Sequence, residues 1–309
     1  MRILFMGSPD LALPSLNAAR EIGKVVGVVT QPPKASGRGR KLIPSPISRE
    51  AAQWGIPVMT PDTLRDSEVE NTLRKLEPEI TVVVAYGKIL PASILTVPKL
   101  GCVNIHASLL PELRGAAPIQ WAIARGYRET GVTLMQMDEG MDTGPILLQR
   151  ATSIGPQETA GELGRRLART GAELVREGLP RLYRGELKPV DQNNDLATYA
   201  PLLTKADGLI DWSMSAREIA NRIRGFSPWP GTYSVRDGGR LLITRAQLLE
   251  EAHNTDPGTI VFTGPEGFQV SCGSGTLKVL AVKPEGKREM AAGEYLSGYK
   301  IQVGEILGS

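Results

Sequence analysis

The sequence predicts an α/β protein with two domains: a Rossmann-like, mostly parallel sheet covered by helices, followed by a small β-barrel. Three observations lead to this prediction. The chain has 309 residues, which is more than one hydrophobic core usually supports. Its first half alternates short apolar runs with helix-like stretches, the pattern of parallel strands and their crossover helices. Its last third contains short β-type runs separated by turn signals.

The first half supplies the elements of the parallel sheet. Strands are expected at 3–6, 24–30, 58–59, 80–84, 103–106, 130–137 and 146–154. Helices are expected at 8–21, 50–54, 67–76, 118–124 and 159–182, and a polar loop at 31–46. The run 80–84 is the most strand-like because it is rich in β-branched residues. In such sheets ligands bind beyond the carboxyl ends of the strands.

The second half changes character after a polar, irregular stretch. We expect a first domain at 1–188, a linker at 189–205 and a second domain at 206–309. A helix is expected at 215–224, and strands at 232–235, 241–244, 259–262, 268–272 and 277–282. Five short strands in a compact segment fit an oligonucleotide-binding (OB)-like barrel.

Composition limits the classes of protein. Hydrophobic residues make up 41% of the chain and the net charge is +3, so any affinity for nucleic acid must come from a local basic patch. Two distant cysteines, Cys102 and Cys272, do not indicate a disulfide framework, and Cys102 is expected to be a small buried residue. The apolar run at 3–6 is too short for a signal peptide or a membrane span, so a cytoplasmic location is expected.

One of the two histidines is a candidate for catalysis. His106 ends the strand that contains Asn104, and side-chain alternation places both residues on the same face of that strand. That position is where such folds carry out chemistry. The alternative is a structural histidine with a turn-forming asparagine nearby. The other histidine, His253, lies in a turn-like sequence and is a poor candidate.

An acidic, glycine-flanked loop at 137–144 contains Asp138 and Asp142. A carboxylate from this loop could orient His106 and stabilise its protonated form. The amide of Asn104 could donate a hydrogen bond to a developing oxyanion. Together these groups suit acyl transfer without a serine or cysteine nucleophile. The alternative is that the aspartates only form turns, which fits Asp138 better than Asp142.

Two cofactor classes are not favoured, and one loop is unusually basic. The histidines and cysteines do not have the spacing of zinc ligands, so no metal is expected. Gly7-Ser8-Pro9 stands where a dinucleotide-binding turn would be rich in glycine. The loop at 31–48 has four cations and no acid, namely Lys34, Arg38, Arg40 and Lys41. It suits phosphate contact near the active site, and the alternative is a solvated surface loop.

Two motifs resemble those of the folate-dependent formyltransferases. They are Asn104-Ile105-His106-Ala107-Ser108-Leu109-Leu110-Pro111 and Met141-Asp142-Thr143-Gly144-Pro145-Ile146. The resemblance implies 10-formyltetrahydrofolate as the formyl donor, with Asn104, His106 and Asp142 as the catalytic set. It also implies a folate pocket lined by Tyr86, Gly87, Ile89, Leu90, Ser108, Leu109, Leu110 and Pro111.

Over nearly its full length the chain resembles the branch of that family whose acceptor is initiator methionyl-tRNA. The stretches that carry this resemblance are 7–10, 30–32, 37–46, 84–91, 115–120 and 228–231. It implies that Arg38, Arg40 and Lys41 contact the tRNA and that the OB-like domain helps to hold it. A monomer is expected, although nothing in the sequence determines the oligomeric state. Glu112 and Leu113 depart from the family, which more often has a basic and an aromatic residue there.

The implied reaction is formyl transfer to the α-amino group of methionine, for translation initiation. A formyltransferase for a nucleotide sugar or for glycinamide ribonucleotide would share the catalytic set but should lack the basic loop and the second domain. A non-catalytic RNA-binding protein would have no use for Asn104, His106 and Asp142.

Overall fold

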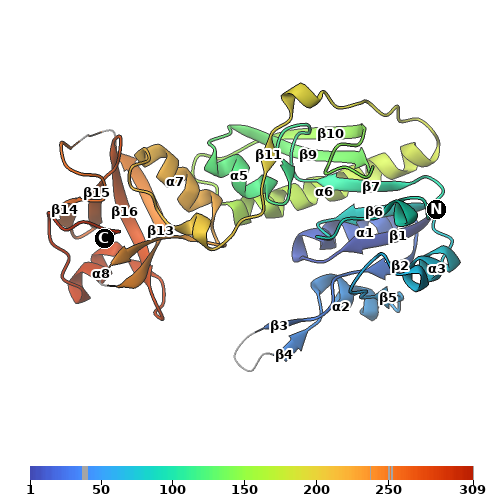
Figure 1. The fold of residues 1–309 in the computed structure, drawn as a ribbon, viewed down its shortest axis with the longest axis horizontal. Coiled ribbons are helices and arrows are strands. Elements are labelled where there is room, and N and C mark those ends of the chain that lie inside the picture. The colour runs from blue at the N-terminus through green and yellow to red at the C-terminus, as the bar shows by residue number, and fades with distance from the viewer. Residues whose placement is uncertain (37–40, 237, 250, 252, 309) are drawn as a thin grey trace. The chain divides into compact units, whose positions relative to one another are not determined.

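A computed structural model describes residues 1–36, 41–236, 238–249, 251 and 253–308. It divides into two compact units (Figure 1). The first unit is Met1–Pro118, Glu129–Ser153 and Gly164–Pro201, and the second is Ile119–Arg128, Ile154–Leu163 and Leu202–Ser309. The structure has the mixed α/β character that the sequence predicts.

The first unit is built on a seven-stranded sheet in the order β10-β9-β7-β6-β1-β2-β5. The strands are β1 (Arg2–Gly7), β2 (Lys24–Val29), β5 (Val58–Met59), β6 (Ile80–Val84), β7 (Cys102–His106), β9 (Glu129–Gln136) and β10 (Ile146–Ser153). Neighbouring strands run parallel along the part of the sheet formed by β7, β6, β1, β2 and β5. The strands β9 and β10 are antiparallel to their neighbours. The prediction of a mostly parallel, Rossmann-like sheet is confirmed.

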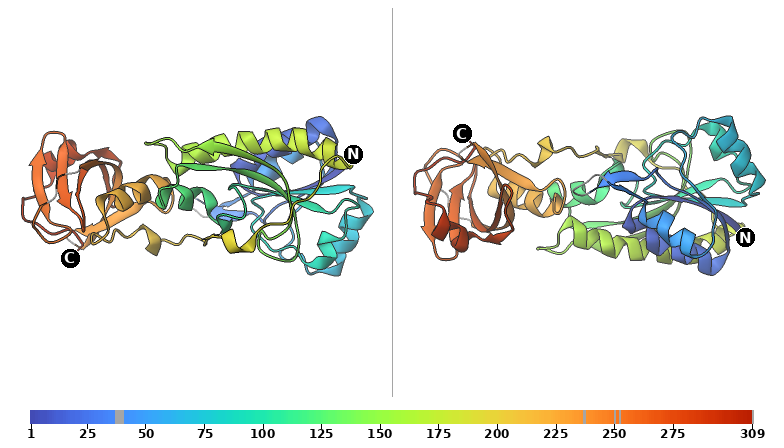
Figure 2. Two further views of the ribbon diagram at one scale, coloured as in Figure 1. Left: turned by 90° about the horizontal axis from the view of Figure 1, so that it is seen from above. Right: turned by 90° about the horizontal axis from the view of Figure 1, so that it is seen from below.

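Helices cover both faces of this sheet (Figure 2). They are α1 (Leu13–Ile22), α2 (Pro46–Gln53), α3 (Ser67–Lys75), α4 (Ala92–Leu95) and most of α6 (Ala160–Tyr183), with the short 3-10 helix η1 (Asp10–Ala12) before α1. Gly171 of α6 lies against Ile105 of β7 and Ser15 of α1, so α1 and α6 share one face. On the other face, Leu73 of α3 and Ile94 of α4 pack in the core with Cys102.

Several local elements differ from the expectation. The loop expected at 31–46 contains a hairpin of β3 (Lys34–Ser36) and β4 (Lys41–Ile43), which its prolines and glycines concealed. Helix α2 begins at Pro46 rather than at residue 50, because the Ser45 side chain caps it by accepting from the Ser48 N–H. The short helix α4 was not predicted.

The segment that follows α6 belongs in part to the first unit. It contains the 3-10 helix η2 (Asn194–Leu196) and the strand β11 (Tyr199–Ala200). This strand pairs in parallel with β8 (Arg114–Gly115), which lies shortly after β7 in the sequence. Residues separated by about eighty positions are thereby brought together beside the end of β7.

The second unit contains a six-stranded antiparallel sheet in the order β12-β13-β16-β15-β14, with β17 paired to β16. The strands are β12 (Thr232–Arg236), β13 (Gly239–Leu249), β14 (Ile260–Gly264), β15 (Gly267–Ser271), β16 (Thr276–Pro284) and β17 (Met290–Ala291). The helices are α5 (Pro118–Ala124), η3 (Ala206–Gly208), α7 (Ala216–Gly225) and α8 (Ala292–Gly298). All five strands expected in this region are present, and β17 and α8 are additional.

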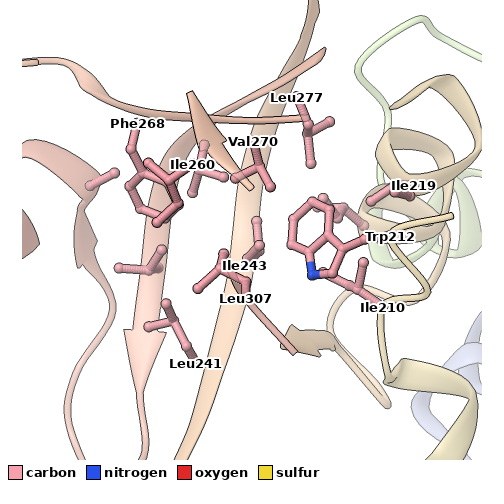
Figure 3. Packing of buried hydrophobic residues seen from close by; sticks show 14 of the residues in the cluster. Ile210, Trp212, Ile219, Leu241, Ile243, Ile260, Phe268, Val270, Leu277 and Leu307 are labelled. Carbon is pink, nitrogen blue, oxygen red and sulfur yellow. The ribbon is translucent and has the colours of Figure 1, made fainter. Parts of the chain in front are cut away.

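The core of the second unit lies between this sheet and its helices (Figure 3). Trp212 and Ile219 pack against Ile243, Val270 and Leu277 from three strands. The buried Trp212 Nε1 donates to Ser234 Oγ at 3.0 Å, so its polar atom is satisfied. Helix α7 begins with a reciprocal capping box between the side chains and backbone of Ser215 and Glu218, which stabilises its first turn. No helix within the described part of the chain is long and apolar enough to cross a membrane.

Candidate active site

The carboxyl end of β7 carries the two polar side chains that the sequence singled out. β7 lies between β6 and β9, with Asn104 opposite Met135 and His106 opposite Thr133 of β9. Side-chain alternation puts Asn104 and His106 on the face that also holds Cys102. His106 is only 6% exposed, so its ring orientation is set by protein groups.

The third predicted residue, Asp142, comes to the same place from the loop between β9 and β10. Its Oδ1 accepts from Asn104 Nδ2 at 3.3 Å, and its Oδ2 lies 3.6 Å from His106 Nδ1. The backbone at Asp142 is left-handed, with φ at 55°, a conformation that aspartate tolerates better than most residues. The structure thus brings the three predicted polar residues together.

Asp138 lies in the same loop and has a different environment. Its Oδ1 accepts from the Gly140 N–H at 3.0 Å and from Thr143 Oγ1 at 2.8 Å, and its side chain is exposed. These contacts stabilise the turn. Gly144 then brings the loop against the preceding strand, because a Cβ there would lie 1.9 Å from the carbonyl oxygen of Gln136. Asp138 shapes the loop, and Asp142 faces His106.

Two backbone groups at 113–115 contact His106 and Asp142, and the sequence did not indicate them. His106 Nε2 lies 3.0 Å from the carbonyl oxygen of Leu113, and the Gly115 N–H donates to Asp142 Oδ2 at 2.8 Å. A carbonyl oxygen can only accept, so Nε2 carries the proton of the neutral ring and Nδ1 is the atom that can gain or lose one. Backbone contacts leave no mark in side-chain patterns, which is why they were missed.

Leu113 has a backbone conformation that such a residue rarely adopts. Its φ is 58°, and a bulky non-glycine residue in this region costs about 1–3 kcal/mol. The segment is held from the other side by Thr198, whose Oγ1 accepts from the Leu113 N–H and whose carbonyl accepts from the Arg114 N–H, both at 2.8 Å. The strained turn that presents the Leu113 carbonyl to His106 is therefore fixed by a distant segment.

The residues expected to bind folate occupy two loops next to this cluster. In the first loop the side chains of Ser108 and Leu110 are buried, and the Leu110 N–H donates to Thr133 Oγ1 at 3.1 Å. Gln149 Nε2 donates to the carbonyl of Leu110 at 2.8 Å. Leu109 and Pro111 are partly exposed. The loop is thus held firmly by β9 and β10.

The second loop follows β6, the parallel neighbour of β7. Tyr86 and Leu90 are buried in the core, where burial raises the pKa of the Tyr86 hydroxyl to about 12. Ile89 is 85% exposed, and Gly87 is exposed with φ at 77°. Of the four residues expected here, Gly87 and Ile89 are exposed to solvent, and the buried Tyr86 and Leu90 anchor the loop in the core.

Of the three cations expected to contact tRNA, one lies within the described residues. Arg38 and Arg40 lie outside the described residues, and Lys41 begins strand β4. His253 is exposed, as its turn-like sequence indicated, and both cysteines are buried free thiols. Among the described residues there is no group of three or more histidine, cysteine or acidic side chains that could hold a metal ion.

Two consecutive parts of the chain match known family models. Residues 1–179 match the formyl transferase family, and residues 202–300 match the formyl transferase C-terminal domain. Fold and site thus define the chain as a formyl transferase. It is 48% identical to the methionyl-tRNA formyltransferase of Citrifermentans bemidjiense over 309 residues, which cover 100% of this chain and 96% of the relative. The chain belongs to the family of methionyl-tRNA formyltransferases.

Solved structures with lower sequence identity share the fold. An N-formyltransferase from Helicobacter canadensis, solved with folinic acid and dTDP-3-aminofucose, has a TM-score of 0.67 at 20% identity and covers 90% of this chain and 98% of its own. A variant of HypX from Aquifex aeolicus has a TM-score of 0.63 at 19% identity, and the match covers 98% of this chain but 49% of HypX.

Proposed function

We propose that this chain transfers a formyl group from 10-formyltetrahydrofolate to the α-amino group of methionine on initiator methionyl-tRNA, for translation initiation. The observation that carries the proposal is the cluster of Asn104, His106 and Asp142 at the carboxyl end of β7. Full-length identity of 48% to a methionyl-tRNA formyltransferase supports the choice of donor and acceptor.

Asn104 is proposed to support the charge that develops on the formyl oxygen. One N–H of its side-chain amide is directed to Asp142 Oδ1 at 3.3 Å, and a primary amide has a second N–H. A preorganised donor directed at a developing oxyanion can lower the barrier by several kcal/mol, about 3–4 in a measured case. Asp142 would hold this donor in position before the substrates react.

His106 is proposed to move the proton during transfer. The amine nitrogen bonds to the formyl carbon, the bond from that carbon to the folate nitrogen breaks, and the amine proton ends on the folate nitrogen. With Nε2 committed to the Leu113 carbonyl, His106 would take up and release this proton at Nδ1. Asp142 Oδ2, 3.6 Å from Nδ1, stabilises the charged ring during the step.

The folate is proposed to bind against the loops at 86–90 and 108–111. Bound 10-formyltetrahydrofolate supplies the formyl group that the chain transfers. The exposed side chain of Ile89 offers an apolar surface for an aromatic ring, and Gly87 leaves backbone polar groups accessible. Tyr86, Leu90, Ser108 and Leu110 would shape these loops from the inside.

The tRNA is proposed to contact Arg38, Arg40 and Lys41, mainly through phosphates. We further propose that the antiparallel sheet of the second unit is an OB-like barrel that helps to hold the tRNA. The proposed division is a catalytic domain at 1–188, a linker at 189–205 and a tRNA-binding domain at 206–309. A monomer in the cytoplasm is proposed as the working form.

The test is a formylation assay with 10-formyltetrahydrofolate and charged initiator tRNA. A nucleotide amino sugar and glycinamide ribonucleotide serve as competing acceptors. We expect turnover on the tRNA and none on the two small acceptors. Turnover on either small acceptor in preference to the tRNA would refute the proposed function.

A further inference from the structure

The side chain of Gln192 touches the backbone of the Asp142 loop at two points. Its Nε2 donates to the carbonyl of Asp142 at 2.8 Å and to that of Gly144 at 2.7 Å. A primary amide has two N–H donors, and both are used here. Gln192 therefore ties down the backbone on both sides of Thr143, where the left-handed conformation of Asp142 sets the direction of its carboxylate.

The oxygen of the same amide accepts hydrogen bonds from the buried Arg114. Gln192 Oε1 accepts from Arg114 Nε at 3.1 Å and from Arg114 Nη2 at 2.8 Å, and Nη2 also donates to Asn194 Oδ1 at 2.8 Å. Arg114 is 2% exposed, and within the described part of the chain it forms no ion pair with a carboxylate. A buried guanidinium needs these amide oxygens, so Gln192 and Asn194 fix where Arg114 lies.

Arg114 stands between the two backbone groups that hold the catalytic pair. The preceding Leu113 carbonyl faces His106 Nε2, and the following Gly115 N–H donates to Asp142 Oδ2. Gln192 thus bridges the Asp142 loop to the 113–115 segment. Thr198 and Ala200 add backbone contacts to Leu113, Arg114 and Ala116 from the same stretch.

We propose that Gln192, Asn194, Thr198 and Ala200 form a brace that positions the reacting groups, with Gln192 as the positioning residue that sets Asp142 against His106. The inference rests on the proposed function for its catalytic readout. Gln192 acts through Asp142 and Arg114 and does not touch the substrates. The brace explains how two loops that both contain left-handed non-glycine residues keep one relative position.

The first test compares two matched variants one position apart. Gln192→Glu keeps an acceptor for Arg114 but replaces the donors to the Asp142 and Gly144 carbonyls with a carboxylate. Asn193→Asp makes the same chemical change at an exposed helix cap, where aspartate is equally suited. We expect kcat to fall about 10- to 100-fold in Gln192→Glu, since displacements near 1 Å cost about that much. The KM values for both substrates should stay within about threefold, and Asn193→Asp should match the wild type.

A double mutant separates positioning from general damage. If Gln192 acts through the catalytic pair, adding Gln192→Glu to Asp142→Asn should lower the single-turnover rate by less than about threefold. Losses that multiply would overturn the proposal. Arg114→Lys is a second variant that tests the same bridge should Gln192→Glu fold poorly. Lysine cannot reach both oxygens with a planar fork, so kcat should fall again with KM unchanged.

A spectroscopic readout does not depend on turnover. The chain has two histidines, so ¹⁵N-labelled histidine gives few signals and His253→Gln assigns them. The His106 ring signals should shift in Gln192→Glu and stay in place in Asn193→Asp. Unchanged ring signals together with unchanged kcat would overturn the brace. An inactive wild type would overturn the proposed function alone, since the ring signals still test the brace.

Discussion

Replacement of Asp142 by asparagine tests the proposed catalytic set with the smallest change in shape. The carboxylate accepts from the Gly115 N–H at 2.8 Å and from Asn104 Nδ2 at 3.3 Å, and faces His106 Nδ1 at 3.6 Å. An asparagine has one acceptor oxygen, so it can keep one of these two donors and must turn its own NH₂ toward the other. The negative charge beside His106 is also lost.

The expected loss of activity exceeds the expected loss of stability. One unsatisfied donor costs about 1–3 kcal/mol, which a domain with about 5–15 kcal/mol of stability survives. Loss of the group that orients and charges a catalytic histidine lowers kcat by roughly 10²- to 10⁴-fold, or about 3–5 kcal/mol of barrier. We therefore expect a folded protein with a melting temperature lowered by a few degrees and nearly no turnover.

The assay is steady-state formylation of charged initiator tRNA, with thermal unfolding measured on the same samples. Asp138→Asn is the matched control, because it makes the same substitution in the same loop at an exposed residue whose side chain hydrogen-bonds to Gly140 and Thr143. It should retain kcat within about threefold. A kcat for Asp142→Asn within threefold of the wild type, or an equal loss in Asp138→Asn, would refute the reasoning.

Three further predictions concern protonation, burial and tRNA contact. His106 should show the Nε2–H tautomer when neutral, because Nε2 faces the Leu113 carbonyl; ¹⁵N chemical shifts that report Nδ1–H would contradict this. Burial raises the pKa of the Cys102 and Cys272 thiols to about 12 from 9.0, so neither should react with iodoacetamide at pH 8 until the chain unfolds. Unfolding frees thiols that ionise near 9, so stability should fall as pH rises from 9 toward 12; rapid labelling of the folded chain would argue against burial. Arg38→Ala should raise KM for tRNA by roughly tenfold and leave KM for folate unchanged, as expected for loss of one charge-assisted phosphate contact; an unchanged KM for tRNA would count against the loop.

The sequence predicted the sheet of the first unit well, because its strands leave local patterns, and it singled out three polar residues that the structure brings together. Their catalytic role stays a prediction. The apolar runs of β1, β2 and β6 are fully buried strands, and helix α5 has the predicted bounds, 118–124. Strand alternation alone placed Asn104 and His106 on the same face. Motif resemblance favoured Asp142 over Asp138, and the hydrogen bonds of each aspartate agree with that choice.

The pairing of β3 with β4 in the basic loop and the backbone contacts of the site could not be predicted from the sequence. The strands β3 and β4 have three residues each, too few for a periodic pattern to emerge among prolines and glycines. The Leu113 carbonyl and the Gly115 N–H belong to no side chain, so residue type gives no sign of their role. Their positions follow from φ angles and from pairing with β11, which are consequences of the folded chain.

The stretch around Gln192 shows why amino-acid composition does not predict which residues hydrogen-bond to each other across the fold. Its asparagines, aspartates and glutamine are typical of a solvated linker. Two of these residues nevertheless have structural partners: Gln192 and Asn194 accept from the buried guanidinium of Arg114, and Gln192 also donates to the carbonyls of Asp142 and Gly144. Burial of Arg114 would have predicted these contacts, but a lone arginine before a glycine gives no indication in the sequence that it is only 2% exposed. A buried charge with no carboxylate partner must be met by neutral oxygens brought from elsewhere in the chain. Gln192 and Asn194 supply these oxygens to Arg114, so the polar stretch packs beside the end of β7. Through the hydrogen bond from Gln192 to the Asp142 carbonyl, this packing holds Asp142 in position next to His106.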